Sequence, residues 1–282
     1  MDLTLGPVSL VVRDLEAMID FYGKDAGLRM KRLDDHYVEF YPGGESSEPL
    51  LILRHDPGAE RAPTIAAGLY HYAILLPTRK SLAAVYLSLG NAGVVFDGYA
   101  DHLVSEALYL TDPEGNGIEI YADRPRSEWP FDEDGKVQMA TQPLDIDSLL
   151  AEVSGITKNT LNAFGDGTKV GHVHLKVTDI TRSVAFYQQL LGMDVMNYWG
   201  SAAFLSAGGY HHHIGMNTWE TLGGPPQKKG WAGLESFTVK IQRTRFDELA
   251  AKLSDSPIAH IQDSERLFVS DPDGIELLIR AI

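Results

Sequence analysis

The sequence contains no cysteine, and this absence excludes several kinds of site at once. Disulfide scaffolds, thiolate-bound metals and cysteine nucleophiles all need a sulfur atom that the chain does not supply. Any bound metal must therefore be held by nitrogen and oxygen, so the ten histidines are the side chains to follow.

Long hydrophobic runs are also lacking. The longest, such as residues 50–53, have only a few members, whereas a transmembrane helix needs about 20 apolar residues. The first residues carry neither the basic nor the apolar segment of a secretory signal. We therefore expect no membrane partner and, by default, a cytoplasmic location.

Positive charge is scarce as well. The 24 lysines and arginines are outnumbered by 39 acidic residues, which gives a formal net charge of −15. Such a surface repels a phosphate backbone, so we expect no nucleic-acid partner. The composition is otherwise that of a globular protein, and a chain of 282 residues has about the length of two domains.

The two halves of the chain repeat each other at a spacing of 165 residues, as residues 8–15 match residues 173–180. A weaker repeat divides each half again, so that the chain consists of four modules of similar length. Each module has a β-like stretch, a helical stretch and further β-like stretches. In the first, residues 8–12 alternate as a strand does, and Asp14 is a suitable N-cap for the next helix. The predicted fold class is therefore α+β, with four βαβββ modules.

A polar, proline-containing connector separates the halves, and a short helix is expected within it at residues 146–153. We place an N-terminal domain of two modules at residues 1–123, the connector at 124–169 and a C-terminal domain of two modules at 170–282.

Histidines recur at equivalent places in the opening strands of the second and third modules. His71 lies in the second module, and His172 and His174 lie in the third. Pro7 and Ser236 take that place in the first and fourth modules. A single histidine in an apolar strand is usually a hydrogen-bonded core residue, but recurrence favours a shared role.

The closing strands differ in the same way. They carry Glu119 in the second module, three histidines at 211–213 in the third, Glu276 in the fourth and apolar residues at 51–53 in the first. Two imidazoles and one carboxylate on strands form the facial triad that suits non-haem Fe(II) and leaves positions open for substrate and dioxygen. The alternative to a metal site is that the two glutamates simply lie on the solvent-exposed face of alternating strands.

Four strings, at residues 101–109, 112–121, 171–175 and 208–215, carry a family resemblance. With them the chain resembles the vicinal oxygen chelate superfamily of glyoxalases, bleomycin resistance proteins and extradiol dioxygenases, and in particular its two-domain catechol 2,3-dioxygenase-like branch. The resemblance implies two open eight-stranded cups with the helices outside, and metal ligands inside one cup.

The resemblance leaves open which modules share the active cup. Two-domain extradiol enzymes use the third and fourth modules, but Ser236 stands where that pattern has a histidine. Crossed pairing of the second and third modules, as in monomeric glyoxalases, gives the ligand set that we favour: His71, Glu119 and His172. Pairing within the second half gives the alternative set: His172, His213 and Glu276.

The three consecutive histidines need separate roles, because strand alternation sends His211 and His213 to one face and His212 to the other. The resemblance gives His212 the acid–base role, since extradiol enzymes carry a His-His pair at this strand. Counting back from the turn instead aligns His213 with Glu119, as a fourth ligand or a catalytic residue. Exposure of these histidines at a sheet edge is the alternative.

Further candidates surround this site. His102 and Tyr121 are candidates for a fourth ligand or for a side chain that hydrogen-bonds to a ligand. Tyr121, Tyr198 and Tyr210 are candidates to hydrogen-bond a phenolate, although buried tyrosines more often serve packing.

The resemblance implies an Fe(II)-dependent extradiol dioxygenase of aromatic compound catabolism, with a catechol-type diol and dioxygen as its small-molecule partners. Mn(II), Ni(II) and Zn(II) are the alternative metals. The competing hypotheses are a glyoxalase-like isomerase or lyase with four protein ligands, and a non-enzymatic module that binds aromatic compounds. Assembly into a homo-oligomer stays open.

Overall fold

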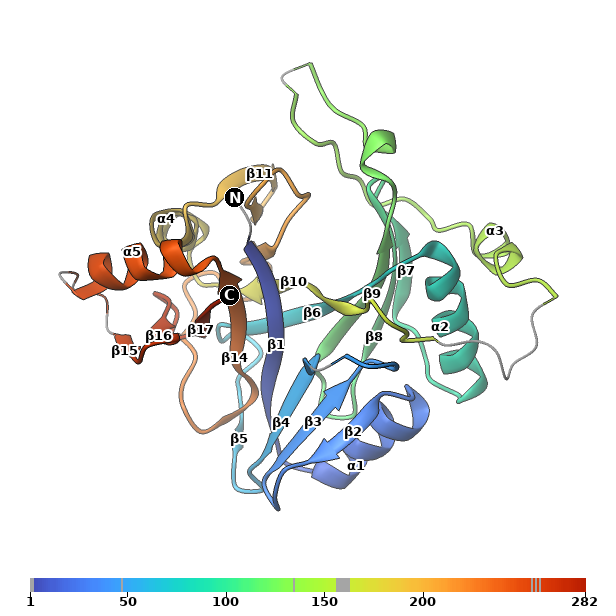
Figure 1. The fold of residues 1–282 in the computed structure, drawn as a ribbon, viewed down its shortest axis with the longest axis horizontal. Coiled ribbons are helices and arrows are strands. Elements are labelled where there is room, and N and C mark those ends of the chain that lie inside the picture. The colour runs from blue at the N-terminus through green and yellow to red at the C-terminus, as the bar shows by residue number, and fades with distance from the viewer. Residues whose placement is uncertain are drawn as a thin grey trace. The chain divides into compact units, whose positions relative to one another are not determined.

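A computed structural model describes residues 3–46, 48–133, 135–155, 163–254, 256, 258 and 260–282. Figure 1 shows the order of its elements, in which an opening strand, a helix and three further strands occur four times. The predicted α+β class and the four βαβββ modules are confirmed.

The first module begins with β1 (Leu3–Val12) and α1 (Leu15–Ile19), which continues into the π-helical turn η1 (Asp20–Asp25). Asp14 caps α1 as predicted, because its side chain accepts a hydrogen bond from the Ala17 backbone N–H. The module ends with β2 (Arg29–Arg32), β3 (Tyr37–Tyr41) and β4 (Leu51–His55), and β5 (Glu60–Arg61) follows.

The second module and the connector follow in the same order. The module consists of β6 (Gly68–Leu76), α2 (Arg79–Asn91), β7 (Gly98–Asp101), β8 (Ser105–Thr111) and β9 (Gly117–Asp123). The connector contains the short 3₁₀-helix η2 (Arg126–Glu128) and α3 (Ile146–Ala151). The helix predicted at 146–153 is thus present and ends two residues earlier. Part of the connector, residues 156–162, lies outside the described residues.

The third and fourth modules complete the chain. The third consists of β10 (Lys169–Lys176), α4 (Ile180–Leu191), β11 (Asp194–Trp199), β12 (Ala202–Ser206) and β13 (Ile214–Asn217). The fourth consists of β14 (Trp231–Ile241), α5 (Arg243–Ser254), β15 (His260–Gln262), β16 (Arg266–Ser270) and β17 (Glu276–Ala281). Among the residues described, no helix combines the length and apolar character that a membrane crossing requires.

The hydrogen-bonded order of the strands assigns the modules to two sheets. One sheet has the order β15-β16-β17-β14-β1-β4-β3-β2, with β5 paired to β14 beside it, and the other has the order β11-β12-β13-β10-β6-β9-β8-β7. The first and fourth modules thus share one sheet, and the second and third share the other. This is the crossed pairing that the sequence favours.

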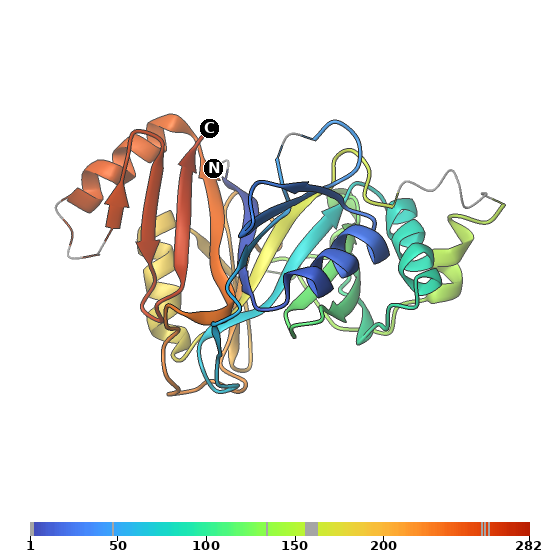
Figure 2. The ribbon, with the colours of Figure 1, turned by 90° about the horizontal axis from the view of Figure 1, so that it is seen from below.

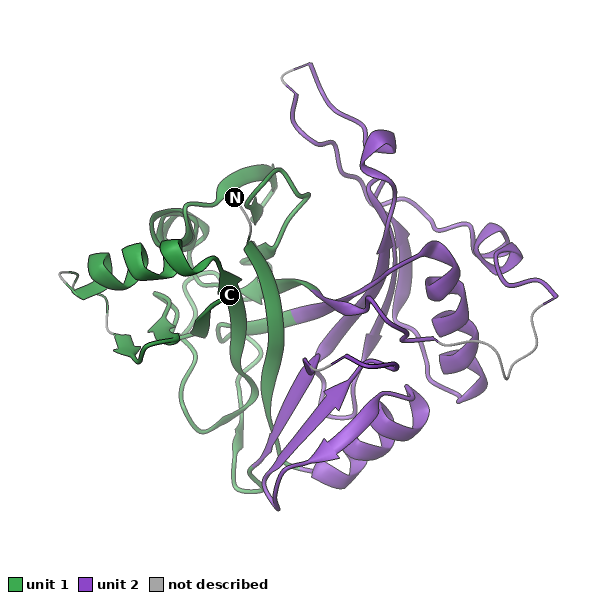
Figure 3. Ribbon diagram, viewed as in Figure 1, with its two compact units in different colours: residues 1–13, 56–70, 171–282 green, residues 14–55, 71–170 purple. Residues whose placement is uncertain are grey.

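The chain divides into two compact units, which Figure 3 colours separately. Unit 1 comprises residues 1–13, 56–70 and 171–282, and unit 2 comprises residues 14–55 and 71–170. The first strand of the chain is therefore grouped with the C-terminal half. The domain boundaries at 123 and 170 stay a prediction.

In unit 1, β1 runs antiparallel to β14, and β14 runs parallel to β17. Helix α4 contacts β12 and helix α5 contacts β17, and Figure 2 shows the orange α5 beside the red strands of this unit. In unit 2, β2, β3 and β4 form an antiparallel ribbon, β6 runs parallel to β9, and α2 covers β8 and β9. Buried aliphatic and aromatic side chains fill the core of each unit.

A buried tyrosine–aspartate hydrogen bond fixes the turn before the closing strand in each unit. In unit 2, Tyr22 donates to Asp112 over 2.8 Å, and Tyr72 donates to Tyr22 over 3.1 Å. In unit 1, Tyr187 donates to Asp271 over 3.0 Å. Burial raises the pKa of Asp112, and it raises the pKa of Asp271 to about 6. These bonds hold the Asp-Pro turns from which β9 and β17 start.

Candidate active site

The centre of the candidate site in unit 2 is a contact between His71 and Glu119. Strand β6 carries His71 and the parallel strand β9 carries Glu119, which lies opposite Ala73 in the register. Both side chains are buried, and His71 Nε2 lies 3.0 Å from Glu119 Oε2. A buried carboxylate next to an imidazole nitrogen is a pair of metal-ligand types brought together by two rigid strands.

Tyr109 and His102 extend this site along β8. Tyr109 lies opposite Glu119 on the neighbouring strand, and its ring centroid is 5.8 Å from that of His71. The Tyr109 hydroxyl lies 2.6 Å from His102 Nε2, and His102 Nδ1 lies 2.7 Å from the Ala140 carbonyl oxygen. Because a carbonyl only accepts, Nδ1 carries the proton, and Nε2 of neutral His102 accepts the hydrogen bond from Tyr109.

A strained turn places His102. The next residue, Leu103, has a φ of 69° and is the single non-glycine residue with positive φ among those described. The Asp101 side chain accepts a hydrogen bond from the Leu103 N–H and is also held by Arg124. Surrounding bonds of this kind maintain a strained backbone, and such strain clusters at functional sites.

Sequence reasoning missed Tyr109. The residue ends the string at 101–109 that carries the family resemblance, so the available signal was its position in that string, seven residues after His102. Tyr121, which was a candidate, is fully buried in a cluster with Ala73 and Ala107, and Tyr109 packs against this cluster.

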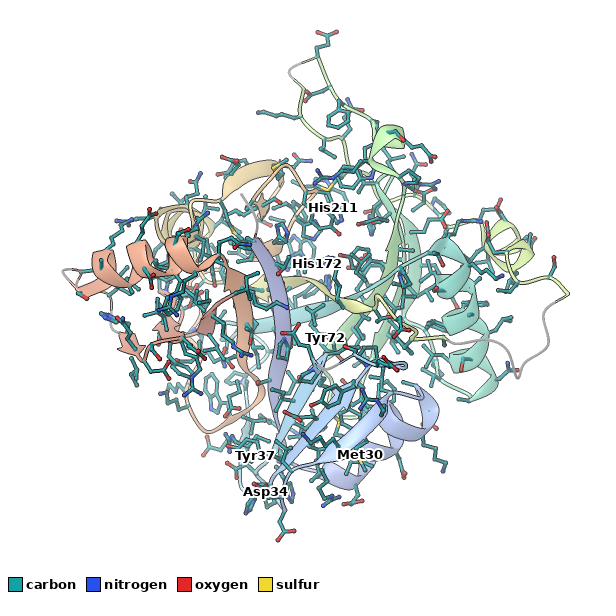
Figure 4. The ribbon with its side chains drawn as sticks, viewed as in Figure 1. Met30, Asp34, Tyr37, Tyr72, His172 and His211 are labelled. Carbon is teal, nitrogen blue, oxygen red and sulfur yellow. The ribbon has the colours of Figure 1, made fainter. Side chains whose placement is uncertain are left out.

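In unit 1, His172 on β10 is buried and lies beside two further histidines. Its ring centroid is 4.1 Å from that of His212 and 6.2 Å from that of His211. Figure 4 labels His172 and His211 in this group. Of the tyrosine candidates in this unit, Tyr210 contacts the rings of His211 and His213, whereas Tyr198 is largely exposed on β11.

The prediction that strand alternation separates the three histidines is wrong. They lie in the loop between β12 and β13, because β13 begins only at Ile214. Within this loop His211 Nδ1 lies 2.9 Å from His212 Nδ1. His213 turns toward β12, where its Nδ1 lies 2.9 Å from Ser206 Oγ and accepts a weaker hydrogen bond from the Ala207 N–H. Local contacts, rather than the period of a strand, orient these rings.

The alignment of His213 with Glu119 is also wrong. Glu119 lies opposite the residue two positions after His71, and in the third module the residue two positions after His172 is His174. His174 lies opposite Gly215. A Cβ atom at Gly215 would lie 2.9 Å from His174 Nδ1, so the imidazole ring fills the space that a side chain would need.

Glu276 does not occupy the place of Glu119 either. It lies opposite Ser236 at the start of β17, and the residue opposite Thr238, two positions further along, is Leu278. Glu276 is half-buried, accepts a hydrogen bond from Ser270 and lies 3.9 Å from Lys229. It is therefore part of a polar group on β16 and β17.

Three buried side chains in the described part of the chain are of the kinds that hold a metal ion. His71 and Glu119 belong to unit 2 and His172 belongs to unit 1, and each offers an imidazole nitrogen or a carboxylate oxygen. They are the residues of the favoured ligand set, and their role as ligands stays a prediction.

The comparisons with known proteins agree with this fold. The family model described as Glyoxalase/Bleomycin resistance protein/Dioxygenase superfamily matches residues 4–120 and 169–279. The protein named catechol-2,3-dioxygenase of Bacillus subtilis (strain 168) is 42% identical over 275 residues, which cover 96% of this chain and 94% of that protein.

Two solved structures share the fold at low identity. A putative dioxygenase from Bacillus subtilis subsp. subtilis str. 168 has a TM-score of 0.63 and 14% identity, with 99% of this chain and 85% of that chain covered. Glyoxalase I from Zea mays has a TM-score of 0.58 and 15% identity, with 99% and 92% covered. The chain belongs to the glyoxalase/bleomycin resistance protein/dioxygenase superfamily.

Proposed function

We propose that the chain is an extradiol dioxygenase that cleaves a catechol-type aromatic diol with dioxygen, at a non-haem Fe(II) held by His71, His172 and Glu119. The relative named catechol-2,3-dioxygenase supports a dioxygenase enzyme, because its 42% identity extends over nearly the whole chain. The ring cleaved, the metal and the ligand roles are the parts that the proposal adds.

The observation that carries the proposal is Gly215. In the second module the closing strand supplies a carboxylate, Glu119, two positions beyond the opening histidine in the register. In the third module the matching position is Gly215, which has no side chain. His71, Glu119 and His172 would therefore hold the ion with three donors where an isomerase with four protein ligands needs a fourth, and a site with three protein ligands would suit a bidentate diol and dioxygen.

The three side chains fit an iron ion in donor type, and two of them also in spacing. Imidazole nitrogen and carboxylate oxygen are the donors of the 2-His-1-carboxylate triad. His71 Nε2 and Glu119 Oε2 lie 3.0 Å apart, which is close enough for one ion to bind both. When bound, Fe(II) would supply Lewis acidity and electron transfer between diol and dioxygen.

Two protein groups are placed to handle protons. Tyr109 donates a hydrogen bond from its hydroxyl group to His102 and lies beside His71. Its oxygen is therefore oriented to accept a hydrogen bond from a diol hydroxyl. His212 packs against His172, and its Nδ1 lies 2.9 Å from His211 Nδ1, so its imidazole lies beside a proposed metal ligand and is of the type that exchanges protons with a substrate. We assign the acid–base role to His212 and a supporting role to His213, whose Nδ1 is used by Ser206 and Ala207.

The test is turnover of catechols by the purified, Fe(II)-loaded protein under air. Ring cleavage beside the diol gives a yellow semialdehyde, which absorbance follows directly, and oxygen uptake should match its formation. The matched control is Glu119→Gln prepared in the same way, which should form no colour. Absence of colour and of oxygen uptake across a panel of catechols, with iron confirmed by elemental analysis, would overturn the proposal.

A further inference from the structure

A row of rings leads from His172 to the surface of unit 1. The His172 ring is 4.1 Å from His212, and His212 is 5.1 Å from Phe204. Phe204 is 5.8 Å from His174, and His174 is 5.1 Å from Tyr70. Each step is a normal distance between ring centroids in contact. The row therefore connects the proposed metal ligand to side chains outside the metal group.

Trp219 completes the outer end of the row. Its ring is 5.1 Å from Tyr70 in an edge-to-face arrangement and 5.7 Å from His174. Tyr70 and Trp219 are 41% and 50% exposed, whereas His174 is 4% exposed. Tyr70 and Trp219 are thus about half exposed to solvent and contact the buried imidazole of His174. Exposed aromatic surface of this kind, beside a buried polar site, is typical of a binding site.

Asn217 holds this group rigid. Its Oδ1 accepts a hydrogen bond from the Trp219 backbone N–H over 3.2 Å, which fixes the orientation of the amide. Its Nδ2 therefore donates to His174 Nε2 over 3.0 Å. Gly215 lies under the His174 ring and leaves it room. A ring held by a hydrogen bond on one side and by close packing below is preorganised for contact with a ligand.

The direction of β10 relates the row to the proposed metal centre. His172 and His174 are two residues apart on one strand, so their side chains share a face and lie about 7 Å apart along it. That is the reach of a substituent on an aromatic diol whose oxygens bind near His172. A substituent pointing along β10 meets His174 first and then Tyr70 and Trp219.

We propose that Tyr70, His174 and Trp219 form a subsite for an uncharged aromatic substituent on the diol. This inference rests on the proposed function for the position of the diol, and it adds the substrate class. The substituent would stack on or against the edge of these rings and cover the exposed surface of Tyr70 and Trp219. The interaction offered is dispersion and ring stacking.

The charges near the outer end support an uncharged substituent. Burial raises the pKa of Tyr70, and the nearby carboxylate of Glu220 raises it further. Lys176 follows on the same face of β10 and is half-buried. Glu220 and Lys176 carry opposite charges, so together they give no net attraction for a carboxylate on the substrate.

The first experiment compares the catechols that the Fe(II)-loaded enzyme cleaves. The probes are catechol, 3-phenylcatechol, 4-phenylcatechol and 3,4-dihydroxyphenylacetate, and the readout is the ratio of kcat/KM for the better phenylcatechol to kcat/KM for catechol. We expect wild type to prefer the phenylcatechol over both catechol and the anionic probe. Trp219→Leu, which keeps an apolar side chain but removes the ring, should lower the ratio about five- to tenfold.

The matched control is Trp199→Leu, since Trp199 is an exposed tryptophan on β11 of the same unit. It should keep the wild-type ratio. An equal loss in the two variants, an unchanged ratio in Trp219→Leu, or a wild-type preference for the anionic probe would each overturn the subsite.

A second readout separates this inference from the proposed function. Calorimetric titration of Zn(II)-loaded protein with the same probes measures binding without redox turnover. If no catechol is cleaved by the iron form, the proposed function fails, and the subsite still stands if Trp219→Leu weakens phenylcatechol binding about five- to tenfold while Trp199→Leu does not. If catechols are cleaved and phenylcatechol binding is the same in both variants, the subsite fails alone.

Discussion

The second and fourth modules contain the same short motif, an Asp-Pro turn followed by Gly-Ile-Glu, yet the two glutamates lie in different places. Glu119 lies opposite Ala73, two positions beyond His71, whereas Glu276 lies opposite Ser236 at the start of its strand. Glu119 is buried beside an imidazole, and Glu276 is half-buried beside Ser270 and Lys229. The same sequence motif therefore does not place its glutamate at the same position in the sheet.

The hydrogen bonds of the two turns explain the difference. The Asp112 N–H donates to the Asn116 carbonyl, and the Asp271 N–H donates to the Ile275 carbonyl, so both turns close four residues after the aspartate. Counted from the aspartate, Glu276 matches Gly117, and Leu278 matches Glu119. The position of a residue in the sheet follows from the turn geometry and not from the nearest similar letters.

The largest effect should come from exchanging these two carboxylates for amides. Glu119→Gln removes the proposed anionic ligand and should lower kcat/KM for catechol about 10³-fold or more, because loss of even an outer partner of a metal ligand costs about 10- to 100-fold. Iron content by elemental analysis should fall with it. Glu276→Gln should stay within about twofold of wild type in both measurements. A comparable loss in Glu276→Gln would show that the fourth module contributes to the site.

A smaller effect is expected at the next pair of matching positions. Tyr109 lies opposite Glu119, and Phe268 lies opposite Leu278, so the fourth module has a ring without the hydroxyl. Tyr109→Phe makes the second module resemble the fourth and removes one hydrogen bond to substrate, which should lower kcat about tenfold. Iron content should be retained, since Tyr109 is not among the three proposed ligands. The matched variant Phe268→Tyr should leave kcat unchanged. Loss of iron in Tyr109→Phe would contradict the assigned role.

The smallest effect concerns the aspartates of the two turns and is read as a pH dependence of stability. Burial raises the pKa of Asp271 to about 6 in the folded protein, against about 3.9 in an unfolded chain. The folded state therefore binds the proton more tightly, and its stability falls as the pH rises from about 4 through 6. From pH 5 to pH 7 this group should lower the free energy of unfolding by about 1.3 kcal/mol.

Asp271→Asn should remove this contribution, so that denaturant unfolding curves at pH 5 and pH 7 differ less than those of wild type by about 1 kcal/mol. Asp112→Asn should act in the same direction, since burial also raises the pKa of Asp112. Asp194→Asn, which changes an exposed residue on β11, should keep the wild-type pH dependence. A wild-type slope in Asp271→Asn would refute the effect of burial on this carboxyl.

The fold was predictable because its signals are local and repeated. The Asp14 cap, the alternation in the strand at residues 8–12 and the 165-residue repeat each depend on neighbours in the sequence, and together they predict four βαβββ modules. The favoured module pairing followed from single residues, because the second module has His71 at the position where the fourth has Ser236. None of these sequence signals depends on how the turns before the closing strands are hydrogen-bonded.

The details of the site could not be predicted for the opposite reason. The orientation of residues 211–213 depends on a loop whose rings contact Ser206 and one another, and no strand period applies to it. The bond between Tyr109 and His102 depends on the strained backbone at Leu103, for which leucine gives no sequence signal. The orientation of the three histidines and the bond between Tyr109 and His102 both depend on strand register and loop contacts, which are tertiary properties.

The close approach of Gly215 to His174 also has a consequence for how the protein can evolve. A carboxylate at position 215 would stand where the second module has Glu119, and would convert the proposed three-donor centre into a four-donor one. The His174 ring occupies that space, since a Cβ at Gly215 would lie 2.9 Å from its Nδ1. Neither substitution alone reaches the new centre, because the glycine must gain a side chain and the histidine must first become smaller. The two positions are therefore coupled, since a fourth ligand at position 215 would require a second substitution at position 174.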